Sequence, residues 1–358
     1  MSIHFHPLTV KKISKETAEC VSITFDMPDH LQNSFQYRQG QSLSIRTFLN
    51  NEEVRRTYSL CSSPLDNEWK VAVKKVEGGL FSTFANEKLK AGDTLEVMQP
   101  VGQFYTELNP AHKKNYLAFA AGSGITPVIS IIKTTLRTEP HSRFTLVYGN
   151  KTLHSIIFFD ELEGLKNKYL DRFNLIHILS RERTDSPIHF GRINREKLDE
   201  LSKLLRYLSF DEVFICGPEE MIFCVKDFLE ATGVDKKKIH FELFNSTPLK
   251  STTKNQATAA DRGKQSTLSI KVDGRRFDFS IPPGSDLTIL DAALKQGADL
   301  PYACKGGMCC TCKARLLEGE VSMDVHWGLE DEEVEKGFIL ACQSHPKTDK
   351  VVVDFDIK

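Results

Sequence analysis

The chain has 358 residues, and its 47 Lys and Arg residues nearly balance its 48 Asp and Glu residues, which leaves a formal net charge of -1. A chain of this length can form two or three domains, each with its own core. The balanced charge gives no reason to expect binding to nucleic acid or to a membrane surface. The N-terminus lacks the features of a signal peptide and no stretch has the length of a membrane span, so we expect a cytoplasmic protein.

The first part of the chain, residues 1–110, has the pattern of a small antiparallel barrel. Short runs alternate apolar and polar positions, and turn residues such as Gly40 and Gly92 separate these runs. A period of two is typical of strands with one buried face. The expected strands include Val21–Phe25, Ser42–Ile45, Trp69–Val73 and Leu95–Val97.

Two groups of residues in this barrel are suited to a ligand. Arg56 and Tyr58 stand two positions apart on an expected strand, so they share a face that suits a phosphate and an aromatic ring. An ordinary half-exposed pair is the alternative. Gly78 and Gly79 precede a helical run with Ser82 at its start, an arrangement that suits an anion. The alternative there is a glycine turn with a capping serine.

Residues 111–244 alternate between apolar runs and helical patterns, which predicts a doubly wound parallel sheet. The expected strands are Tyr116–Ala121, Phe144–Tyr148, Leu175–Leu179, Glu212–Cys216 and His240–Phe244. The expected helices are Thr126–Leu136, Phe158–Lys168, Arg195–Leu205 and Glu219–Thr232.

Two glycine turns follow strands of this sheet, at the carboxyl edge where such sheets bind ligands. Gly122–Gly124 allows the backbone to approach a pyrophosphate at a helix N-terminus, and Cys216–Pro218 repeats the arrangement. Pro127 replaces the third glycine of the dinucleotide fingerprint, so a tight structural turn is the alternative. No acidic residue ends the strand at Tyr148, where NAD-binding sites often bind a ribose hydroxyl.

The last part of the chain has its own pattern. Residues 245–266 are rich in Thr, Ser, Lys, Asn, Gln and Ala without apolar periodicity, which predicts a flexible linker. Two runs, Leu268–Val272 and Phe277–Ile281, flank Asp273-Gly274 and predict a hairpin. A helix over Thr288–Gln296 and a strand over Val351–Phe355 complete a domain over residues 267–358.

This domain contains cysteines at the spacing of a plant-type 2Fe-2S cluster. Four residues separate Cys304 from Cys309, two separate Cys309 from Cys312, and Cys342 follows downstream. Structural zinc, which usually takes two close pairs of ligands, is the alternative. The odd count of nine cysteines argues against a disulfide framework. Cys310 lies off the ligand spacing and is interpreted as a packing residue.

The Arg-x-Tyr-Ser strand and the glycine turns resemble those of the ferredoxin-NADP reductase superfamily. The resemblance implies that Arg56 contacts the FAD pyrophosphate, that Tyr58 stacks on the isoalloxazine and that Ser59 lies near flavin N5. It places the reacting atoms near Ser59, Cys216 and Glu242. The cofactor-binding residues that it implies are Arg56, Tyr58, Ser59, Val73, Lys74, Gly78, Gly79, Ser82, Gly122, Gly124, Thr126, Pro127, Ser180, Arg181, Cys216, Gly217, Pro218 and Phe244.

The choice of nucleotide follows from the same resemblance. Ser180 and Arg181 follow a strand at the position where NADPH-using members place a serine and an arginine for the 2′-phosphate. Together with the missing acidic residue, this favours NADPH over NADH. A solvated loop is the alternative for Arg181 and Arg183, and a core position is the alternative for Phe244.

Residues 268–356 resemble plant-type ferredoxins of the β-grasp fold. Over its full length the chain resembles the reductase components of bacterial phenylacetyl-CoA epoxidases, with segments such as Ala120-Ala-Gly-Ser-Gly-Ile-Thr-Pro127 and Phe214-Ile-Cys-Gly-Pro218. Those reductases use NADPH, FAD and a 2Fe-2S cluster. The implied partner is the oxygenase component of a multicomponent di-iron enzyme of phenylacetate degradation. The open alternatives are a reductase that uses NADPH or NADH to serve another oxygenase or hydroxylase, and a non-enzymatic redox sensor.

Overall fold

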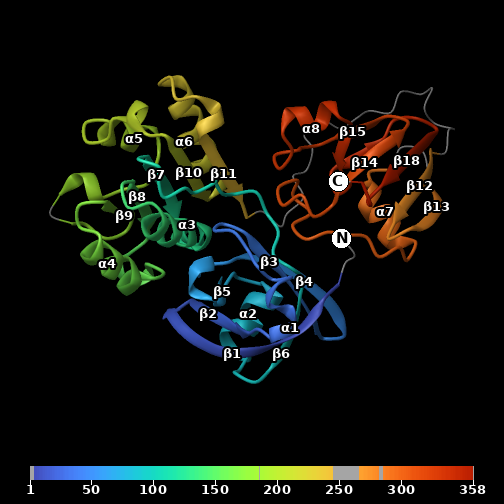
Figure 1. The fold of residues 1–358 in the computed structure, drawn as a ribbon, viewed down its shortest axis with the longest axis horizontal. Coiled ribbons are helices and arrows are strands. Elements are labelled where there is room, and N and C mark those ends of the chain that lie inside the picture. The colour runs from blue at the N-terminus through green and yellow to red at the C-terminus, as the bar shows by residue number, and fades with distance from the viewer. Residues whose placement is uncertain (1–3, 185, 245–265, 282–284, 358) are drawn as a thin grey trace. The chain divides into compact units, whose positions relative to one another are not determined.

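The structure is a computed structural model that describes residues 4–184, 186–244, 266–281 and 285–357. The chain divides into two compact units (Figure 1). One unit is His6–Phe244, and the other contains the described residues from Ser266 onward together with residues 4–5. The predicted linker lies outside the described residues apart from Ser266, which begins a strand.

The first sheet of the larger unit is antiparallel, with the order β4-β3-β6-β1-β2-β5. A bridge between Leu60, just after β4, and Val71 in β5 joins the two edge strands, so the sheet closes into a barrel. Helix α2 (Leu80–Glu87) packs beside it. The strands are β1 (His6–Thr17), β2 (Cys20–Asp26), β3 (Ser42–Leu49), β4 (Glu52–Ser59), β5 (Trp69–Lys74) and β6 (Thr94–Val97).

The four strands expected from alternation are confirmed in this barrel. The sequence pattern missed β1, the longest strand. Only Leu8 and Val10 of β1 are buried, and its C-terminal half has no fully buried side chain. Because alternation needs one buried face, that half gives no periodic signal.

The second sheet of this unit is parallel, with the order β11-β10-β7-β8-β9. Helices α3 (Ile125–Thr138) and α4 (Phe159–Lys168) cover one face, and α5 (Arg195–Leu201) and α6 (Glu219–Ala231) cover the other (Figure 1). The doubly wound prediction is confirmed, although α5 ends four residues earlier than expected. The strands are β7 (Asn115–Ala121), β8 (Arg143–Asn150), β9 (Phe173–Leu179), β10 (Glu212–Gly217) and β11 (Ile239–Leu243).

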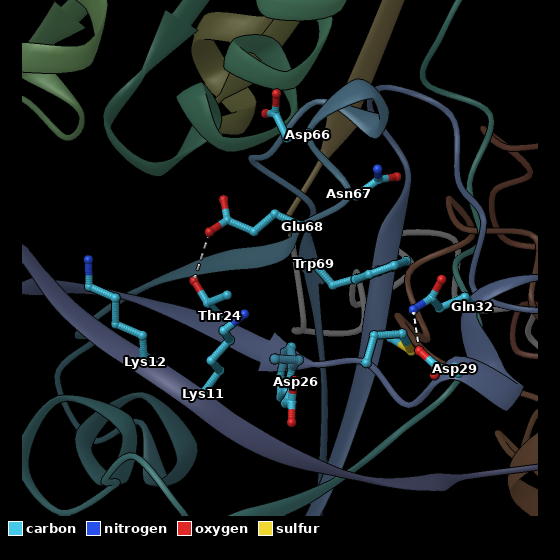
Figure 2. Close-up of a pocket in the computed structure, with 12 residues that line it drawn as sticks. Lys11, Lys12, Thr24, Asp26, Asp29, Gln32, Asp66, Asn67, Glu68 and Trp69 are labelled. Carbon is cyan, nitrogen blue, oxygen red and sulfur yellow. Dashed lines mark hydrogen bonds between the residues drawn. The ribbon is translucent and has the colours of Figure 1, made fainter.

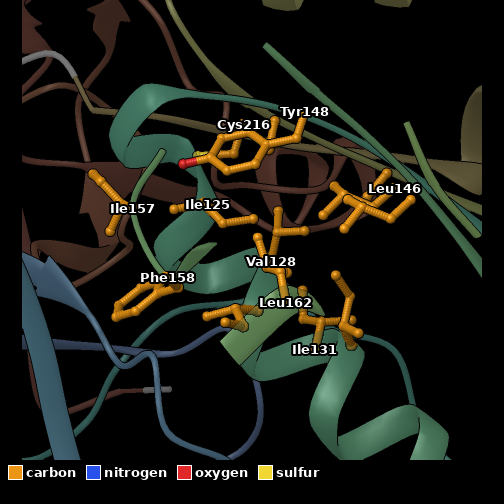
Figure 3. Packing of buried hydrophobic residues seen from close by; sticks show 14 of the residues in the cluster. Ile125, Val128, Ile131, Leu146, Tyr148, Ile157, Phe158, Leu162 and Cys216 are labelled. Carbon is orange, nitrogen blue, oxygen red and sulfur yellow. The ribbon is translucent and has the colours of Figure 1, made fainter. Parts of the chain in front are cut away.

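A single apolar cluster joins this sheet to the barrel. Ile125, Val128 and Ile131 of α3 pack with Leu146 and other residues of the parallel sheet (Figure 3). Four barrel residues belong to the same buried cluster, namely Cys20, Cys61, Ala72 and Phe104. The barrel and the parallel sheet therefore share a core.

The smaller unit has a mixed sheet with the order β13-β12-β18-β14-β16, in which β12 and β18 run parallel. The predicted hairpin is confirmed, and Asp273 and Gly274 at its turn both have positive φ. Thr288 caps α7 (Ile289–Lys295) by accepting a hydrogen bond from the Asp291 amide. The remaining elements are β12 (Ser266–Val272), β13 (Arg275–Ile281), β14 (Lys313–Glu318), β15 (Val321–Met323), α8 (Asp331–Glu335), β16 (Phe338–Leu340), β17 (Ser344–Pro346) and β18 (Lys350–Asp354).

Candidate functional site

Three residues that are far apart in the sequence meet where β4, β10 and β11 end. Ser59 Oγ donates a hydrogen bond to Glu242 Oε2 at 3.2 Å. Cys216 and Glu242 are directly paired across the parallel strands β10 and β11. Burial, followed by the nearby Glu242 carboxylate, raises the pKa of the Cys216 thiol, so this thiol is neutral at ordinary pH. The structure therefore brings together the three residues that the family resemblance implies to lie near the reacting atoms.

The Gly122–Gly124 turn, which follows β7, packs directly onto this group. A Cβ atom on Gly124 would lie 2.0 Å from the carbonyl oxygen of Cys216, so only glycine allows this approach. Gly122 has a φ of 54°, and its carbonyl accepts a hydrogen bond from Tyr148 Oη at 2.9 Å. A Cβ on Gly122 would lie 3.7 Å from Nζ of Lys74, a barrel residue. The turn therefore sits between the barrel and the end of β10.

Thr126 and Pro127 lie in the first turn of helix α3, just after the glycine turn, and both residues are buried. Thr126 Oγ1 donates to the carbonyl of Ser123 at 3.0 Å. The Thr126 hydrogen bond closes the turn, and a pyrophosphate at this position would be held through backbone amides at the helix N-terminus.

The two residues of the Arg-x-Tyr pair differ in exposure. Arg56 is exposed and donates to the carbonyl of Arg55 at 2.8 Å. Tyr58 is half-buried, with its ring centroid 5.4 Å from that of Phe81, and burial raises the pKa of its hydroxyl. Val73 is fully buried in the barrel core, so its side chain does not line an open groove.

In the Gly78–Gly79 turn, the Ser82 hydroxyl bonds to residues of the turn and does not cap the helix. Gly79, not Ser82, is the N-cap of α2. The Ser82 hydroxyl accepts from the amide of Val76 at 3.1 Å and donates to the carbonyl of Gly79 at 3.2 Å. Because both bonds close the turn itself, the alternative in which the Ser82 hydroxyl caps the helix does not hold, and the anion site expected at this turn stays a prediction.

The other predicted nucleotide residues also lie at the carboxyl edge of the parallel sheet. Ser180 and Arg181 directly follow β9, where backbone hydrogen bonds join them to residues 150–151. The Arg181 side chain is exposed, while Arg183 lies over the ring of Phe190 at 5.6 Å. Phe244 follows β11 and is 41% exposed, so it is not a core residue. Gly217 and Pro218 connect β10 to α6, with Pro218 at the N-cap.

In the smaller unit, Cys304 and Cys309 form one pair of thiols. The backbone amides of Gly306 and Cys309 donate to Cys304 Sγ at 3.3 and 3.4 Å. The Cys309 thiol also donates to it, and chiefly for that reason the pKa of Cys304 falls to about 5. The hydrogen bond with Cys304 and burial raise the pKa of Cys309 in turn.

Cys312 and Cys342 form a second pair. Both side chains are almost completely buried, and the hydrogen bond between them raises the pKa of Cys312 and lowers that of Cys342. Within the described ranges, no three His, Cys, Asp or Glu side chains converge as they would on one metal ion. Two pairs of thiols suit the two irons of a 2Fe-2S cluster, each of which takes two cysteines. The donor set therefore fits such a cluster.

Cys310 and Gln343 support the cysteine loop without belonging to either pair. Cys310 has a φ of 56°, and its thiol donates to the carbonyl of Gly328 at 2.7 Å. Gln343 Nε2 donates to the carbonyls of Lys305 and Cys342 at 2.8 and 2.9 Å, and it lies 3.7 Å from Cys342 Sγ. The sequence analysis did not predict a role for Gln343. The only feature of the sequence that points to it is its position directly after Cys342, a predicted cluster ligand.

A cavity of about 660 Å³ opens elsewhere on the barrel (Figure 2). Its lining combines basic and acidic side chains and includes none of the residues assigned to FAD or the nucleotide. The lining residues are Lys11, Lys12, Thr24, Phe25, Asp26, Met27, Asp29, Gln32, Asp66, Asn67, Glu68 and Trp69.

Comparison with known proteins explains this arrangement. Three family models match the chain in succession: an oxidoreductase FAD-binding domain over residues 7–105, an oxidoreductase NAD-binding domain over residues 119–227, and a 2Fe-2S iron-sulfur cluster binding domain over residues 270–347. The chain is 46% identical over 355 residues to a subunit of the 1,2-phenylacetyl-CoA epoxidase of Escherichia coli, with 99% of this chain and 98% of that protein covered. It belongs to the ferredoxin reductase family.

Two other known proteins are similar to the reductase over almost its whole length. The ferredoxin reductase component of 3-ketosteroid-9-alpha-monooxygenase from Rhodococcus rhodochrous is 35% identical, with 97% of this chain and 96% of that one covered. The solved structure of phthalate dioxygenase reductase has the same fold, with a TM-score of 0.58, 23% identity and 98% of both chains covered. The reductase is therefore an oxidoreductase with modules for FAD, a pyridine nucleotide and a 2Fe-2S cluster. None of its described helices has the length and apolar character needed to span a membrane.

Proposed function

We propose that the reductase passes electrons from NADPH through FAD and a 2Fe-2S cluster to the oxygenase component of a multicomponent di-iron enzyme that acts on phenylacetyl-CoA. The pathway would be phenylacetate degradation, and the complex between the two components would be transient. The observation that carries the proposal is the identity of 46% over 99% of the chain to a phenylacetyl-CoA epoxidase subunit. A cytoplasmic location belongs to the proposal, because thiolates remain available to iron there.

The proposal divides the chain into an FAD barrel (1–110), a nucleotide domain (111–244), a linker (245–266) and a ferredoxin domain (267–358). When bound, the flavin supplies the chemistry that accepts two electrons from a hydride donor and releases them one at a time. Ser59 and Glu242 would hold a proton between hydroxyl and carboxylate at the flavin edge, since their 3.2 Å hydrogen bond joins the two modules. The buried, neutral Cys216 would pack beside the nicotinamide without introducing a charge.

The other site residues have specific roles in this proposal. Arg56 would neutralise the FAD pyrophosphate, and the half-buried Tyr58 ring would cover the isoalloxazine. Ser180 and Arg181 would bind the 2′-phosphate, which is why we favour NADPH over NADH. Phe244 would cover an aromatic ring, since 41% of its surface is exposed just past β11. The cluster would be held by the cysteine pairs Cys304 with Cys309 and Cys312 with Cys342.

The test is an anaerobic titration with NADPH and NADH, followed by reconstitution with an oxygenase component that acts on phenylacetyl-CoA. We expect NADPH to reduce the flavin and then produce the EPR signal of the reduced cluster, and we expect turnover only with the phenylacetyl-CoA oxygenase. Turnover with a steroid oxygenase instead would show that the acceptor is wrong while the internal electron path is right. Equal reduction by both nucleotides would overturn the preference for NADPH.

A further inference from the structure

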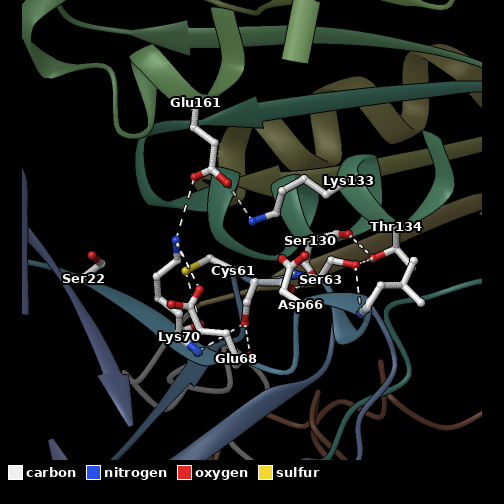
Figure 4. Close-up of polar contacts among 12 residues, drawn as sticks. Ser22, Cys61, Ser63, Asp66, Glu68, Lys70, Ser130, Lys133, Thr134 and Glu161 are labelled. Carbon is white, nitrogen blue, oxygen red and sulfur yellow. Dashed lines mark hydrogen bonds and ion pairs between the residues drawn. The ribbon is translucent and has the colours of Figure 1, made fainter. Parts of the chain in front are cut away.

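Hydroxyl groups at helical spacing form the polar part of the contact between the barrel and helix α3 (Figure 4). Ser130 Oγ donates to the carbonyl of Ser62 at 2.6 Å. One turn later, Thr134 Oγ1 donates to the carbonyl of Ser130 at 2.6 Å and lies 2.9 Å from Ser63 Oγ. Because the single hydroxyl hydrogen of Thr134 is used in the first bond, Ser63 is the donor in the second. We call these four residues the hydroxyl contact.

The hydroxyl contact is shielded from water. Ser62, Ser63 and Ser130 are completely buried, and Thr134 is 4% exposed. An outer layer continues it, in which Arg137 pairs with Asp66 and donates to the carbonyl of Leu65 at 3.2 Å. Buried hydrogen bonds require one geometry, whereas the apolar packing around them is non-directional. The contact therefore specifies how α3 lies against the barrel.

A second polar group supports the same arrangement from α4. Glu161 accepts a hydrogen bond from Lys133 Nζ of α3 at 2.8 Å, and its other carboxylate oxygen lies 4.0 Å from Lys70 Nζ of the barrel. Lys133 is 7% exposed, so protein screens the lysine end of this ion pair from solvent. Polar bonds from the barrel thus reach both helices on this face of the parallel sheet.

Both sides of the hydroxyl contact continue directly into the candidate site. Ser62 lies three residues after Ser59 on the barrel side. On the other side, α3 begins immediately after the Gly122–Gly124 turn. We propose that the hydroxyl contact is a positioning device that sets the distance and angle between the nucleotide turn and the flavin face. This inference rests on the proposed function.

The step that depends on this geometry is hydride transfer. The C4–H bond of the reduced nicotinamide breaks and its two electrons and hydrogen form a bond to flavin N5, so the nicotinamide is oxidised and the flavin is reduced. Transfer of this kind requires the reacting atoms to be held about 3–3.5 Å apart, and a misplacement of about 1 Å can slow it on the order of a hundredfold. Binding of the nucleotide alone does not require that alignment.

Helix α3 offers a matched control. Thr134→Val removes the acceptor of Ser63 and leaves a buried donor unpaired. Thr135→Val makes the same chemical change one residue later, where the hydroxyl is buried and finds no hydrogen-bond partner among the described residues. Thr134→Ser keeps the hydroxyl, so its rate of flavin reduction should equal that of the wild type. Ser130→Ala, added to Thr134→Val, removes both hydrogen bonds between α3 and the Ser62–Ser63 pair.

The experiment compares these variants in the full-length holoenzyme by anaerobic rapid mixing with saturating NADPH. The dissociation constant of NADP⁺ and the charge-transfer absorbance between nicotinamide and reduced flavin are measured in parallel. We expect the Ser130→Ala/Thr134→Val variant to reduce its flavin about tenfold to a hundredfold more slowly. Its charge-transfer absorbance should weaken, and its dissociation constant should stay unchanged. Thr135→Val and Thr134→Ser should match the wild type.

Two results would overturn the inference. One is a double variant that behaves like Thr135→Val, and the other is a loss of NADP⁺ affinity that accounts for the whole loss of rate. If the double variant does not fold, Thr134→Val is compared with Thr134→Ser instead. The inference then requires slower flavin reduction in Thr134→Val at an unchanged dissociation constant of NADP⁺, and equal rates in the two variants would overturn it. A wild-type enzyme whose flavin neither nucleotide reduces would overturn the proposed function itself, and this inference with it.

Discussion

Replacing Gly124 with alanine should uncouple the nucleotide turn from Cys216. The added Cβ would lie 2.0 Å from the Cys216 carbonyl oxygen and 2.8 Å from the Gly217 amide nitrogen, and these are backbone atoms that cannot rotate away. An ordinary contact begins at 3.4 Å, so the turn and the end of β10 must separate by about 1.4 Å. A displacement of that size should slow hydride transfer by on the order of a hundredfold, since about 1 Å can have that effect.

The cost in stability should be smaller than the cost in rate. Forcing an extra methyl into a packed contact costs about 1–3 kcal/mol. Anaerobic rapid mixing measures flavin reduction, thermal unfolding measures stability, and EPR after chemical reduction reports on the cluster. We expect slow flavin reduction with an unchanged cluster signal.

Gly164 is the matched control for this substitution. It lies in α4, and a Cβ added there meets no atom within 4 Å. Gly164→Ala should therefore leave the rate unchanged, and it should stabilise the helix by up to about 1 kcal/mol. A Gly124→Ala enzyme that reduces its flavin at the wild-type rate would refute the reasoning that this close approach positions the nucleotide.

Four further predictions concern the cofactors. Cys342→Ser should abolish the EPR signal of the cluster while NADPH still reduces the flavin, and loss of both would contradict modular transfer. Cys310→Ser keeps a donor for the Gly328 carbonyl and should retain the cluster, so a cluster-free variant would show that Cys310 is a ligand. Gln343→Leu removes an amide donor near Cys342 Sγ and should lower the reduction potential in an EPR-monitored redox titration, where an unchanged potential would count against its role. Arg181→Ala should raise KM for NADPH more than KM for NADH, and equal increases in steady-state assays would remove the argument for phosphate recognition.

Local chemistry explains which features could be predicted from the sequence. The turn at Asp273-Gly274 and the cap at Thr288 depend on residues within a few positions of one another, so their patterns are visible in the chain. The cysteine spacing is equally local for three of the four thiols. The C-terminal half of β1 was missed because none of its side chains is fully buried, so no alternation of apolar and polar residues marks it as a strand.

Features formed by tertiary packing could not be predicted in the same way. The Ser59–Glu242 hydrogen bond joins residues 183 positions apart, and only a family resemblance suggested that the two side chains meet. The bond between Ser63 and Thr134 has no sequence signature, because serine and threonine occur in many other roles. Val73 illustrates the converse, since alternation places it on a strand without deciding whether its side chain faces the core or a ligand.

The two cysteine pairs close loops of very different length, and this links cluster assembly to folding. Cys304 and Cys309 are five residues apart, so a short flexible loop can bring them together before the domain is complete. Cys312 and Cys342 are 30 residues apart, and β14 and β16 pair with each other in the segment between them. Closing the longer loop costs more chain entropy. The folded sheet already holds the chain in this closed arrangement, so the cluster does not have to close the loop by itself. The first iron can therefore be held by a local loop, while the second needs a folded sheet, and the complete cluster should in turn stabilise that sheet against unfolding.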